Sequence, residues 1–552
     1  MRAYFGFAIL FSLAINLLYL ASPLYMLQVY DRVISSASIV TLVMLTLALL
    51  LAFGALASLD VVRARVLTRA SIRLDRVMAS RVMTAIIDRR PTEGGSKSQL
   101  LRDFDNFRQF VTGSGIHAVF DLPWAPIYIA VIFVLHPLLG AFSFGASVIL
   151  IVLALINERL IKPPLTASGE AASRHYGFTE MALRNTEVVR AMGMTTGLLR
   201  RWARDRNRML ERQVVASDRA AFLSSTIKFM RLSMQSLILG LGAYLVIERS
   251  VTVGAMFAAS ILLGRALQPV EQIVGSWRSL VSAWAAIIRI RDLLVANPIQ
   301  NPRLALPRPR GRITVEGLTS AVPGISKPIL RAIAFQIEPG EVLGVIGPSG
   351  SGKSTLARHI VGVLVPHAGA VRLDGGDVTQ WPRETFGEYI GYLPQDVELF
   401  ADTVAMNISR FRPSDDKSVI AAAQLAGLHE LILRLPNGYE TQVGDGGAIL
   451  SGGFRQRIGL ARAAYGNPSA VVLDEPNSNL DAAGDAALTE CILELKKRGT
   501  TIIIISHRPS ALNAVDKLMV LNDGAVELLG PRAEVINRLT RAVPVQPAAA
   551  AS

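Results

Sequence analysis

The chain has 552 residues, enough for roughly two to four domains; 51% of them are hydrophobic and only 18% are charged. Soluble domains carry about 25% charged residues, so the shortfall indicates that part of the chain lies in lipid. The formal net charge of +14 is typical of a protein that binds nucleic acid, or of one with cytoplasmic loops beside an anionic membrane. The single cysteine, Cys491, excludes an intrachain disulfide and a Cys/His metal site.

The first half contains six apolar stretches long enough to cross a bilayer as helices. Such a helix needs about 20 mostly apolar residues, because lipid offers the backbone no hydrogen-bond partners. The third stretch contains Pro123 and Pro126 and the sixth contains Arg265, which weakens these two hydropathy signals. The six predicted spans are about 4–25, 39–59, 117–136, 139–158, 229–247 and 252–271.

Charged residues between the spans set the predicted orientation. The stretches 60–116 and 159–228 are long and rich in arginine, whereas the other connections are short and carry little charge. The positive-inside rule places the long stretches and both chain ends in the cytoplasm, and six spans fit that arrangement. Because the arginines cluster between spans, we expect no nucleic-acid partner.

The two long stretches exceed ordinary loops and have helical composition, interrupted near 89–95 and 192–197. The simplest prediction is that membrane helices continue into the cytoplasm as antiparallel pairs, with turns near 85–98 and 183–197. At 1.5 Å per residue, about 25 residues give an arm of roughly 37 Å. A separate cytoplasmic helical bundle is the alternative.

The second half has a different texture. After a membrane domain expected over 1–296, residues 297–312 are rich in proline and arginine and are predicted to form a linker. Short β-branched runs then alternate with helical stretches over 313–538, which predicts an α/β domain with a largely parallel sheet. The tail, 539–552, is expected to be disordered.

A glycine-rich loop in this domain matches the phosphate-binding pattern of P-loop NTPases. It follows the apolar run 341–346 and precedes the helical run 355–364, the context that the motif requires. Its N–H groups and the helix N-terminus supply positive potential. Lys353 is expected to reach the β- and γ-phosphates, and Ser354 to hold Mg²⁺. The predicted ATP-binding residues are Gly347, Pro348, Ser349, Gly350, Ser351, Gly352, Lys353, Ser354 and Thr355.

Two acids end a second apolar run, 470–475. Asp474 suits Mg²⁺, directly or through water, and Glu475 is expected to polarise the attacking water as general base. His507 follows a third apolar run, at the edge where a parallel sheet places its ligands, and is expected to contact the γ-phosphate. Acids often end strands, and a lone histidine is more often structural. These assignments therefore depend on the other motifs that occur with them in the same domain.

Together these residues resemble the ATP-binding cassette (ABC) transporters, over almost the whole chain. The resemblance implies ATP hydrolysis with Mg²⁺, and gives Gln395 a part in catalysis and metal binding. Phe454 stands where that family usually has glutamine, and Val322 where an aromatic residue usually stacks on adenine, which leaves the nucleotide preference open. The resemblance identifies a signature loop, Leu450, Ser451, Gly452 and Gly453, and a D-loop, Ser478, Asn479, Leu480 and Asp481.

In that family the signature loop closes over ATP held by a partner domain. Ser451 and the two glycines precede a helical stretch, so they form a second anion-binding helix end. The chain holds one domain of each kind. The resemblance therefore implies a half-transporter that forms a homodimer with two identical composite sites.

The membrane half is similar to the permease/ATPase subunits of bacterial type I secretion, which export proteases, lipases and repeats-in-toxin proteins. The stretches 22–36 and 120–140 carry this similarity; interfacial anchoring of aromatic and proline residues is the alternative reading. Cys491 is the only cysteine, which argues against the branch with an N-terminal cysteine peptidase. The similarity implies a polypeptide cargo with a C-terminal signal, a periplasmic adaptor (membrane-fusion) protein, an outer-membrane channel and a location in the lipid of the inner membrane.

Three other functions stay open. The same scaffold suits an exporter of lipid or drug-like molecules. An ATP-sensing membrane regulator would barely hydrolyse ATP, and Glu475 and His507 count against it. A soluble DNA-maintenance ATPase shares the motifs but would be extracted by salt without detergent. Polar residues in the spans, such as Asn16 and Gln28, either line a pore or pack helices, and the sequence does not decide between these roles.

Overall fold

The computed structural model describes seven stretches of the chain, and its parts form two compact units that are treated separately below. One unit is helical and the other is an α/β domain. The described residues are 2–88, 97–298, 307–321, 327–413, 415–447, 449–508 and 511–541. Residues 89–96 of the turn expected near 85–98, most of the linker, Val322 and the tail beyond residue 541 lie outside them.

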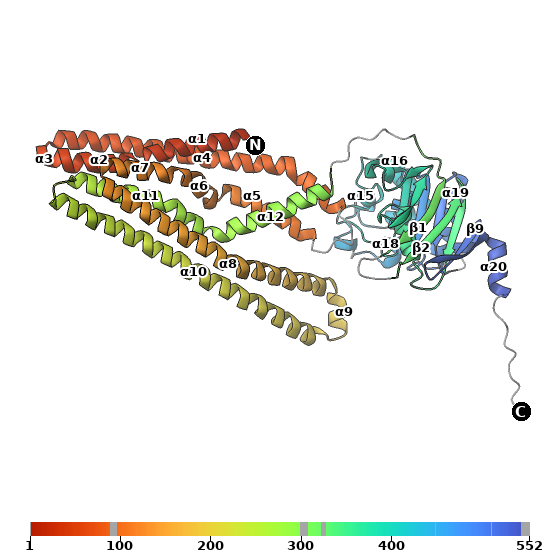
Figure 1. Ribbon diagram of the computed structural model, residues 1–552. Helices are drawn as coiled ribbons and strands as arrows, with labels where there is room; N and C mark the ends of the chain where they lie inside the picture. Colours follow the sequence, from red (N-terminus) through yellow and green to blue (C-terminus); the bar gives the residue numbers. More distant parts are fainter. Residues whose placement is uncertain are drawn as a thin grey trace, which may run out of the picture. The chain divides into compact units, whose positions relative to one another are not determined.

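Six candidate membrane spans occur in the helical unit, and they confirm the six predicted from hydropathy (Figure 1). The third span is interrupted by one turn of 3-10 helix, Leu122–Trp124, where Pro123 cannot donate a helical hydrogen bond. The first is interrupted by a π-helical turn, Val29–Val33. The helices are α1 (Arg2–Leu18), α2 (Ala21–Gln28), α3 (Ile34–Ser36), α4 (Ile39–Asp88), α5 (Lys97–Thr112), α6 (Ser114–Asp121), α7 (Ala125–Leu135), α8 (Pro137–Arg184), α9 (Thr186–Ala191), α10 (Thr195–Ile247), α11 (Val253–Gly275) and α12 (Trp277–Ala296).

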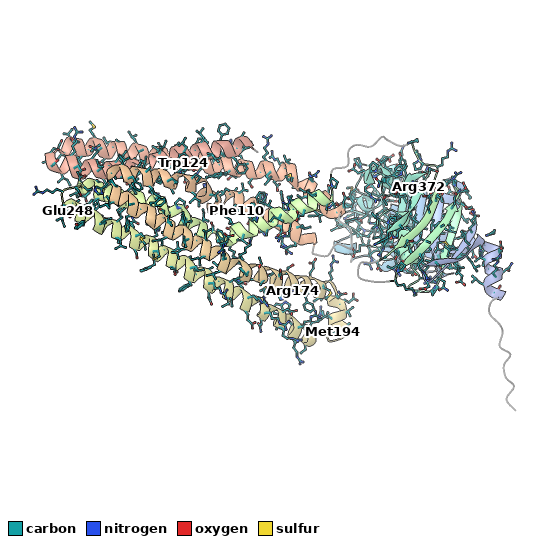
Figure 2. All side chains as sticks on the ribbon, in the orientation of Figure 1. Phe110, Trp124, Arg174, Met194, Glu248 and Arg372 are labelled. Carbon is teal, nitrogen blue, oxygen red and sulfur yellow. The ribbon has the colours of Figure 1, made fainter. Side chains whose placement is uncertain are left out.

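Helices α8 and α10 form a long antiparallel pair joined by the short helix α9 (Figure 1). They have 48 and 53 residues, so at 1.5 Å per residue each is about 70–80 Å long, more than twice the hydrocarbon thickness. Arg174 lies in the part of α8 next to α9, and Met194 lies between α9 and the start of α10 (Figure 2). The pair thus consists of continuous helices rather than a separate bundle; its cytoplasmic location stays a prediction.

The α/β unit contains two sheets. The six-stranded sheet has the order β10-β9-β3-β8-β7-β6, in which all neighbours except β10 and β9 are parallel. This agrees with the predicted largely parallel sheet. Both β7 and β8 are buried throughout, because one face of the sheet packs against helices and the other against a helix and the strands of a second sheet. The strands are β1 (Ile313–Ser320), β2 (Leu330–Ile337), β3 (Val342–Ile346), β4 (Ala368–Leu373), β5 (Gly376–Asp377), β6 (Ile390–Leu393), β7 (Ala470–Asp474), β8 (Thr501–Ile505), β9 (Lys517–Asn522) and β10 (Ala525–Pro531).

A second, antiparallel sheet of order β2-β1-β4-β5 was not predicted. In β2, buried and exposed residues are mixed, which is a weaker signal than a continuous apolar run. The helices of this unit are α13 (Lys353–Ile360), α14 (Arg383–Tyr389), α15 (Val404–Ile408), α16 (Asp416–Leu425), α17 (His429–Leu433), α18 (Gly452–Ala464), α19 (Ala482–Lys497) and α20 (Arg532–Arg541). The last helix runs three residues past the expected domain end at 538.

Cys491 lies on α19 in the core of this unit and is fully buried. Burial raises the pKa of its thiol to about 12. A thiol that stays protonated is a poor nucleophile, so Cys491 acts as a small apolar core residue, as the sequence predicted.

Candidate active site

The phosphate loop connects β3 to α13. Gly350 and Gly352 adopt φ angles of +81° and +97°, a region that glycine enters without the Cβ penalty of other residues. A Cβ on Gly347 would lie 2.0 Å from the carbonyl oxygen of Leu521. At Gly350, by contrast, a Cβ would meet nothing within 4 Å. The loop is therefore packed against the sheet on one side and open on the other.

Lys353 lies at the centre of this loop. Its side chain is buried, and Nζ donates hydrogen bonds of 2.8 Å to the carbonyl oxygens of both Gly347 and Pro348. Burial lowers the pKa of Lys353, whereas the carboxylates of Glu475 and Asp474 act to raise it. A bound phosphate would offer the Lys353 ammonium charged acceptor oxygens in place of the two neutral carbonyl oxygens.

Asp474 ends β7 and is also buried. Burial raises the pKa of its carboxyl, opposed by a hydrogen bond from Ser354. Its Oδ1 atom has no hydrogen-bond partner within the described stretches. A buried carboxylate oxygen without a partner, beside a serine hydroxyl, fits the hard oxygen ligands that Mg²⁺ prefers. The same stretches hold no group of three or more His, Cys, Asp or Glu side chains suited to a metal, as expected for an ion that also binds water and nucleotide phosphates.

The three predicted catalytic residues lie together. Gln395 Nε2 is 3.5 Å from Glu475 Oε2, and His507 Nε2 is 3.7 Å from Glu475 Oε1. They follow β6, β7 and β8, which are neighbouring parallel strands, while the phosphate loop follows β3 beside β8. Because parallel strands end at one edge, this topology gathers the candidates where α/β proteins bind their ligands. Gln395 contacts Glu475, and its predicted part in metal binding stays a prediction.

Glu475 has an unusual backbone conformation. Its φ is +48°, a left-handed value that costs a non-glycine residue about 1–2 kcal/mol. Its N–H donates to the carbonyl oxygen of Ile505 at 2.9 Å, and its carbonyl oxygen accepts from the N–H of Ser478 at 3.2 Å. The turn that follows β7 therefore holds the carboxylate away from the regular strand direction.

The signature loop and the D-loop pack against each other. Ser451 is the N-cap of α18, and its Oγ accepts a 3.3 Å hydrogen bond from the N–H of Phe454. A Cβ on Gly453 would lie 3.0 Å from the carbonyl oxygen of Asn479. The Phe454 side chain is partly buried and packs on the apolar core. This explains how phenylalanine is accommodated at a position where glutamine was expected.

Asp481 of the D-loop has a structural role in this chain. It caps α19 by accepting a 2.8 Å hydrogen bond from the N–H of Gly484, and Arg457 of α18 lies 3.1 Å away. The Gly484 hydrogen bond and then the Arg457 charge hold the pKa of Asp481 below its usual value. Asp481 thus joins α19 to the signature helix.

Two protein families match this chain. Residues 5–270 match the ABC transporter transmembrane region, and residues 330–478 match the ABC transporter family. The chain is also 43% identical over 534 residues to the type I secretion system ATP-binding protein PrsD of Rhizobium meliloti, covering 96% of this chain and 92% of that protein. The chain belongs to the ABC transporters, in the type I secretion branch. It is a multi-pass membrane protein whose α/β domain couples ATP hydrolysis to transport.

More distant proteins are also similar to this ABC transporter. The cyclolysin secretion/processing ATP-binding protein CyaB of Bordetella pertussis is 28% identical over 537 residues, covering 96% of this chain and 75% of CyaB. The solved structure of a bacterial Atm1-family ABC exporter with ATP bound has a TM-score of 0.83 and 21% identity, over 99% of both chains. The latter supports the fold alone.

One functional candidate in the ABC transporter was missed by sequence reasoning. Gln456 on α18 is 1% exposed, and its Nε2 donates to the carbonyl oxygens of Glu475 and Pro476 at 3.4 and 3.1 Å. The signature helix thereby holds the turn that carries the candidate general base. A glutamine on an otherwise apolar helix face, alongside Leu460 and Ala463, was the available signal.

We expect Gln456→Ala to lower kcat for ATP roughly tenfold with little change in KM, because the turn at Glu475 loses its support while the phosphate loop is untouched. Steady-state ATPase measurements on the purified protein test this. Gln424→Ala, which removes an exposed glutamine from α16, is the matched control. A wild-type kcat, or a change confined to KM, would contradict the positioning role.

Proposed function

We propose that this ABC transporter exports a polypeptide across the inner membrane of a bacterium, as the permease/ATPase of a type I secretion system. The observation that supports this most strongly is the 43% identity to PrsD along nearly the whole of both chains. Six apolar helices and an intact set of nucleotide-site residues fit that role. A periplasmic adaptor, an outer-membrane channel and a cargo with a C-terminal signal are the partners that this proposal requires.

The proposed catalytic unit is a homodimer in which each nucleotide contacts two chains. Lys353 and the N–H groups of its loop bind the phosphates, and the signature loop of the partner subunit covers the same nucleotide. Ser354 and Asp474 would hold Mg²⁺, which supplies positive charge to the phosphates. Glu475 accepts a proton from the attacking water as general base. Gln395 and His507 flank its carboxylate and orient it.

Movement of the two α/β domains of the homodimer is proposed to reach the spans through long helices such as α8 and α10. ATP that bridges two chains binds the closed dimer more tightly than the open one, so it shifts the population towards closure. Hydrolysis removes the bridging phosphate and allows reopening. The cargo then moves by alternation between these states.

Deleting the gene and comparing culture supernatants by mass spectrometry tests the function. We expect one or a few proteins to disappear, to return with the wild-type gene and to stay absent with Glu475→Gln. An unchanged supernatant, together with altered membrane lipids or drug sensitivity, would instead support the small-molecule exporter.

A further inference from the structure

Helix α11 presents two chemically different faces. One face is buried against other spans and includes Leu262, Ala266 and Val270. The other face carries Arg265, Gln268 and Gln272, whose spacing of three and four residues places them on one side of the helix. All three side chains line two polar cavities of about 690 and 860 Å³. Cavities of this size are typical of ligand sites.

Arg265 lies well inside the membrane-spanning part of α11. At 1.5 Å per residue it is about 15 Å from the helix end at Gly275. Its guanidinium lies 3.9 Å from the centre of the Tyr19 ring, and Nη1 donates to Gln268 Oε1 at 3.2 Å. An ionisable residue at such a depth is costly and usually marks a functional site.

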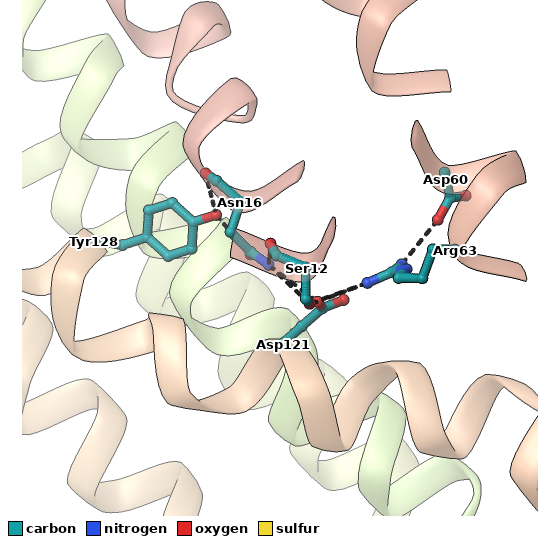
Figure 3. A network of polar contacts seen from close by, with 6 residues as sticks. All are labelled: Ser12, Asn16, Asp60, Arg63, Asp121 and Tyr128. Atoms are coloured by element: carbon teal, nitrogen blue, oxygen red, sulfur yellow. Dashed lines mark hydrogen bonds and ion pairs between the residues drawn. The ribbon is translucent and has the colours of Figure 1, made fainter. Parts of the chain in front are cut away.

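Ion pairs neutralise most of the charges that line the smaller polar cavity, of about 690 Å³. Arg63 forms ion pairs of 2.8 Å with Asp60 and 2.9 Å with Asp121 (Figure 3). Asn16 donates to Asp121 at 3.0 Å and accepts from the Tyr128 hydroxyl at 2.8 Å. These contacts join α1, α4, α6 and α7. The Asn16 side chain therefore has its hydrogen bonds within the helix bundle and holds these helices together.

The larger cavity, between α10 and α11, retains an excess of positive charge. Arg231 is paired with Glu271. Lys228 and Arg265 line the same cavity, and neither has an acidic partner among the residues that the structure describes. The rest of the lining includes Ser224, Ser225 and Gln235, which offer hydrogen bonds but no compensating charge.

We propose that this cavity, named here the α10–α11 cavity and centred on Arg265 and Lys228, binds acidic side chains of the exported polypeptide; the inference rests on the proposed export function. The guanidinium of Arg265 offers a forked pair of donors that matches a carboxylate, and Lys228 adds a point charge. Gln235 and Gln268 can bind the polypeptide's amide groups. The site thereby favours acidic segments over neutral ones.

A lipid headgroup is the competing anion, and the lining disfavours it. A lipid also brings acyl chains, which need an apolar surface. The apolar cavity of about 580 Å³ between α7, α8 and α11 is lined by Ala266, Leu267 and Val270, on the other face of α11. None of these three residues lines the α10–α11 cavity, where Ile261 is the one large apolar side chain among the charged, amide and hydroxyl groups that line it in the described part of the chain.

The test uses the full-length transporter in phosphatidylcholine nanodiscs and two fluorescent peptides. One peptide is rich in Asp and Glu, and the other has Asn and Gln at the same positions. We expect the wild type to bind the acidic peptide about tenfold more tightly, and Arg265→Gln to remove that preference. Arg265→Lys should retain part of it. Arg249→Gln removes an exposed arginine from the α10–α11 connection and should keep all of it.

Three results would overturn the inference. The wild type could bind both peptides equally, or the preference could survive in Arg265→Gln. Alternatively, phosphatidylglycerol added to the discs, and not the acidic peptide, could show Arg265-dependent binding, which would identify a lipid site. If the proposed export function is wrong, a different experiment shows it: the proteins in the culture supernatant stay the same when the transporter gene is deleted. Arg265→Lys separates loss of charge from misfolding, because it changes the same position and keeps the positive charge; equal binding of both peptides by the wild type overturns the inference without any variant.

Discussion

Replacing Glu475 with glutamine is expected to stop ATP turnover and leave ATP bound. Glutamine keeps the shape of the side chain and its contact with Gln395, but it cannot accept a proton from water. General-base catalysis contributes about 10²–10⁴-fold, so kcat should fall by at least about 100-fold. Phosphate release measures the turnover, and binding of a fluorescent ATP analogue measures the retained affinity.

The matched control for this prediction is Glu490→Gln, which makes the same chemical change at an exposed position of α19. It should retain wild-type turnover. Residual activity of Glu475→Gln near the wild-type rate would show that another group accepts the proton.

Replacing Lys353 with alanine is expected to remove ATP binding itself. The ammonium occupies the centre of the phosphate loop, where it already makes two hydrogen bonds to carbonyl oxygens. Loss of a buried charge that is expected to contact phosphate should weaken ATP binding on the order of 100-fold. Binding of the fluorescent analogue provides the measurement, and turnover should be lost with it.

Lys417→Ala removes an exposed lysine from α16 and serves as the control. The two principal variants should differ in kind, since one binds ATP without hydrolysing it and the other does not bind it. If Lys353→Ala bound ATP with wild-type affinity, the assigned phosphate site would be wrong.

The sequence was most informative where local pattern decides structure. Long apolar runs predicted the six spans, and continuous β-branched runs predicted β3, β7 and β8. Since those strands are parallel neighbours, placing a lysine, an acid pair and a histidine after them was enough to bring these residues to one edge. The departure at Phe454 is resolved by its packing on the core.

Features that depend on contacts between distant segments were not predictable. The mixed burial along β2 obscured the antiparallel sheet. Gln456 acquires its role only when α18 meets the turn after β7. Likewise, Arg265 only weakened the hydropathy signal of the sixth span in the sequence. The cavity that it shares with Lys228 forms only when α10 and α11 lie side by side.

The most direct test of the proposed homodimer is disulfide cross-linking between two copies of the chain. Cys491 is buried and inert, so cysteines introduced by Ser349→Cys and Ser451→Cys, at exposed positions of the phosphate and signature loops, would be the reactive ones. Each cysteine is introduced into a separate chain that also carries Glu475→Gln, which should retain ATP. We predict a disulfide-linked dimer when the two variants are mixed with ATP, and none from either variant alone. Absence of that dimer in the mixture, or a disulfide within a single chain that carries both substitutions, would contradict the account.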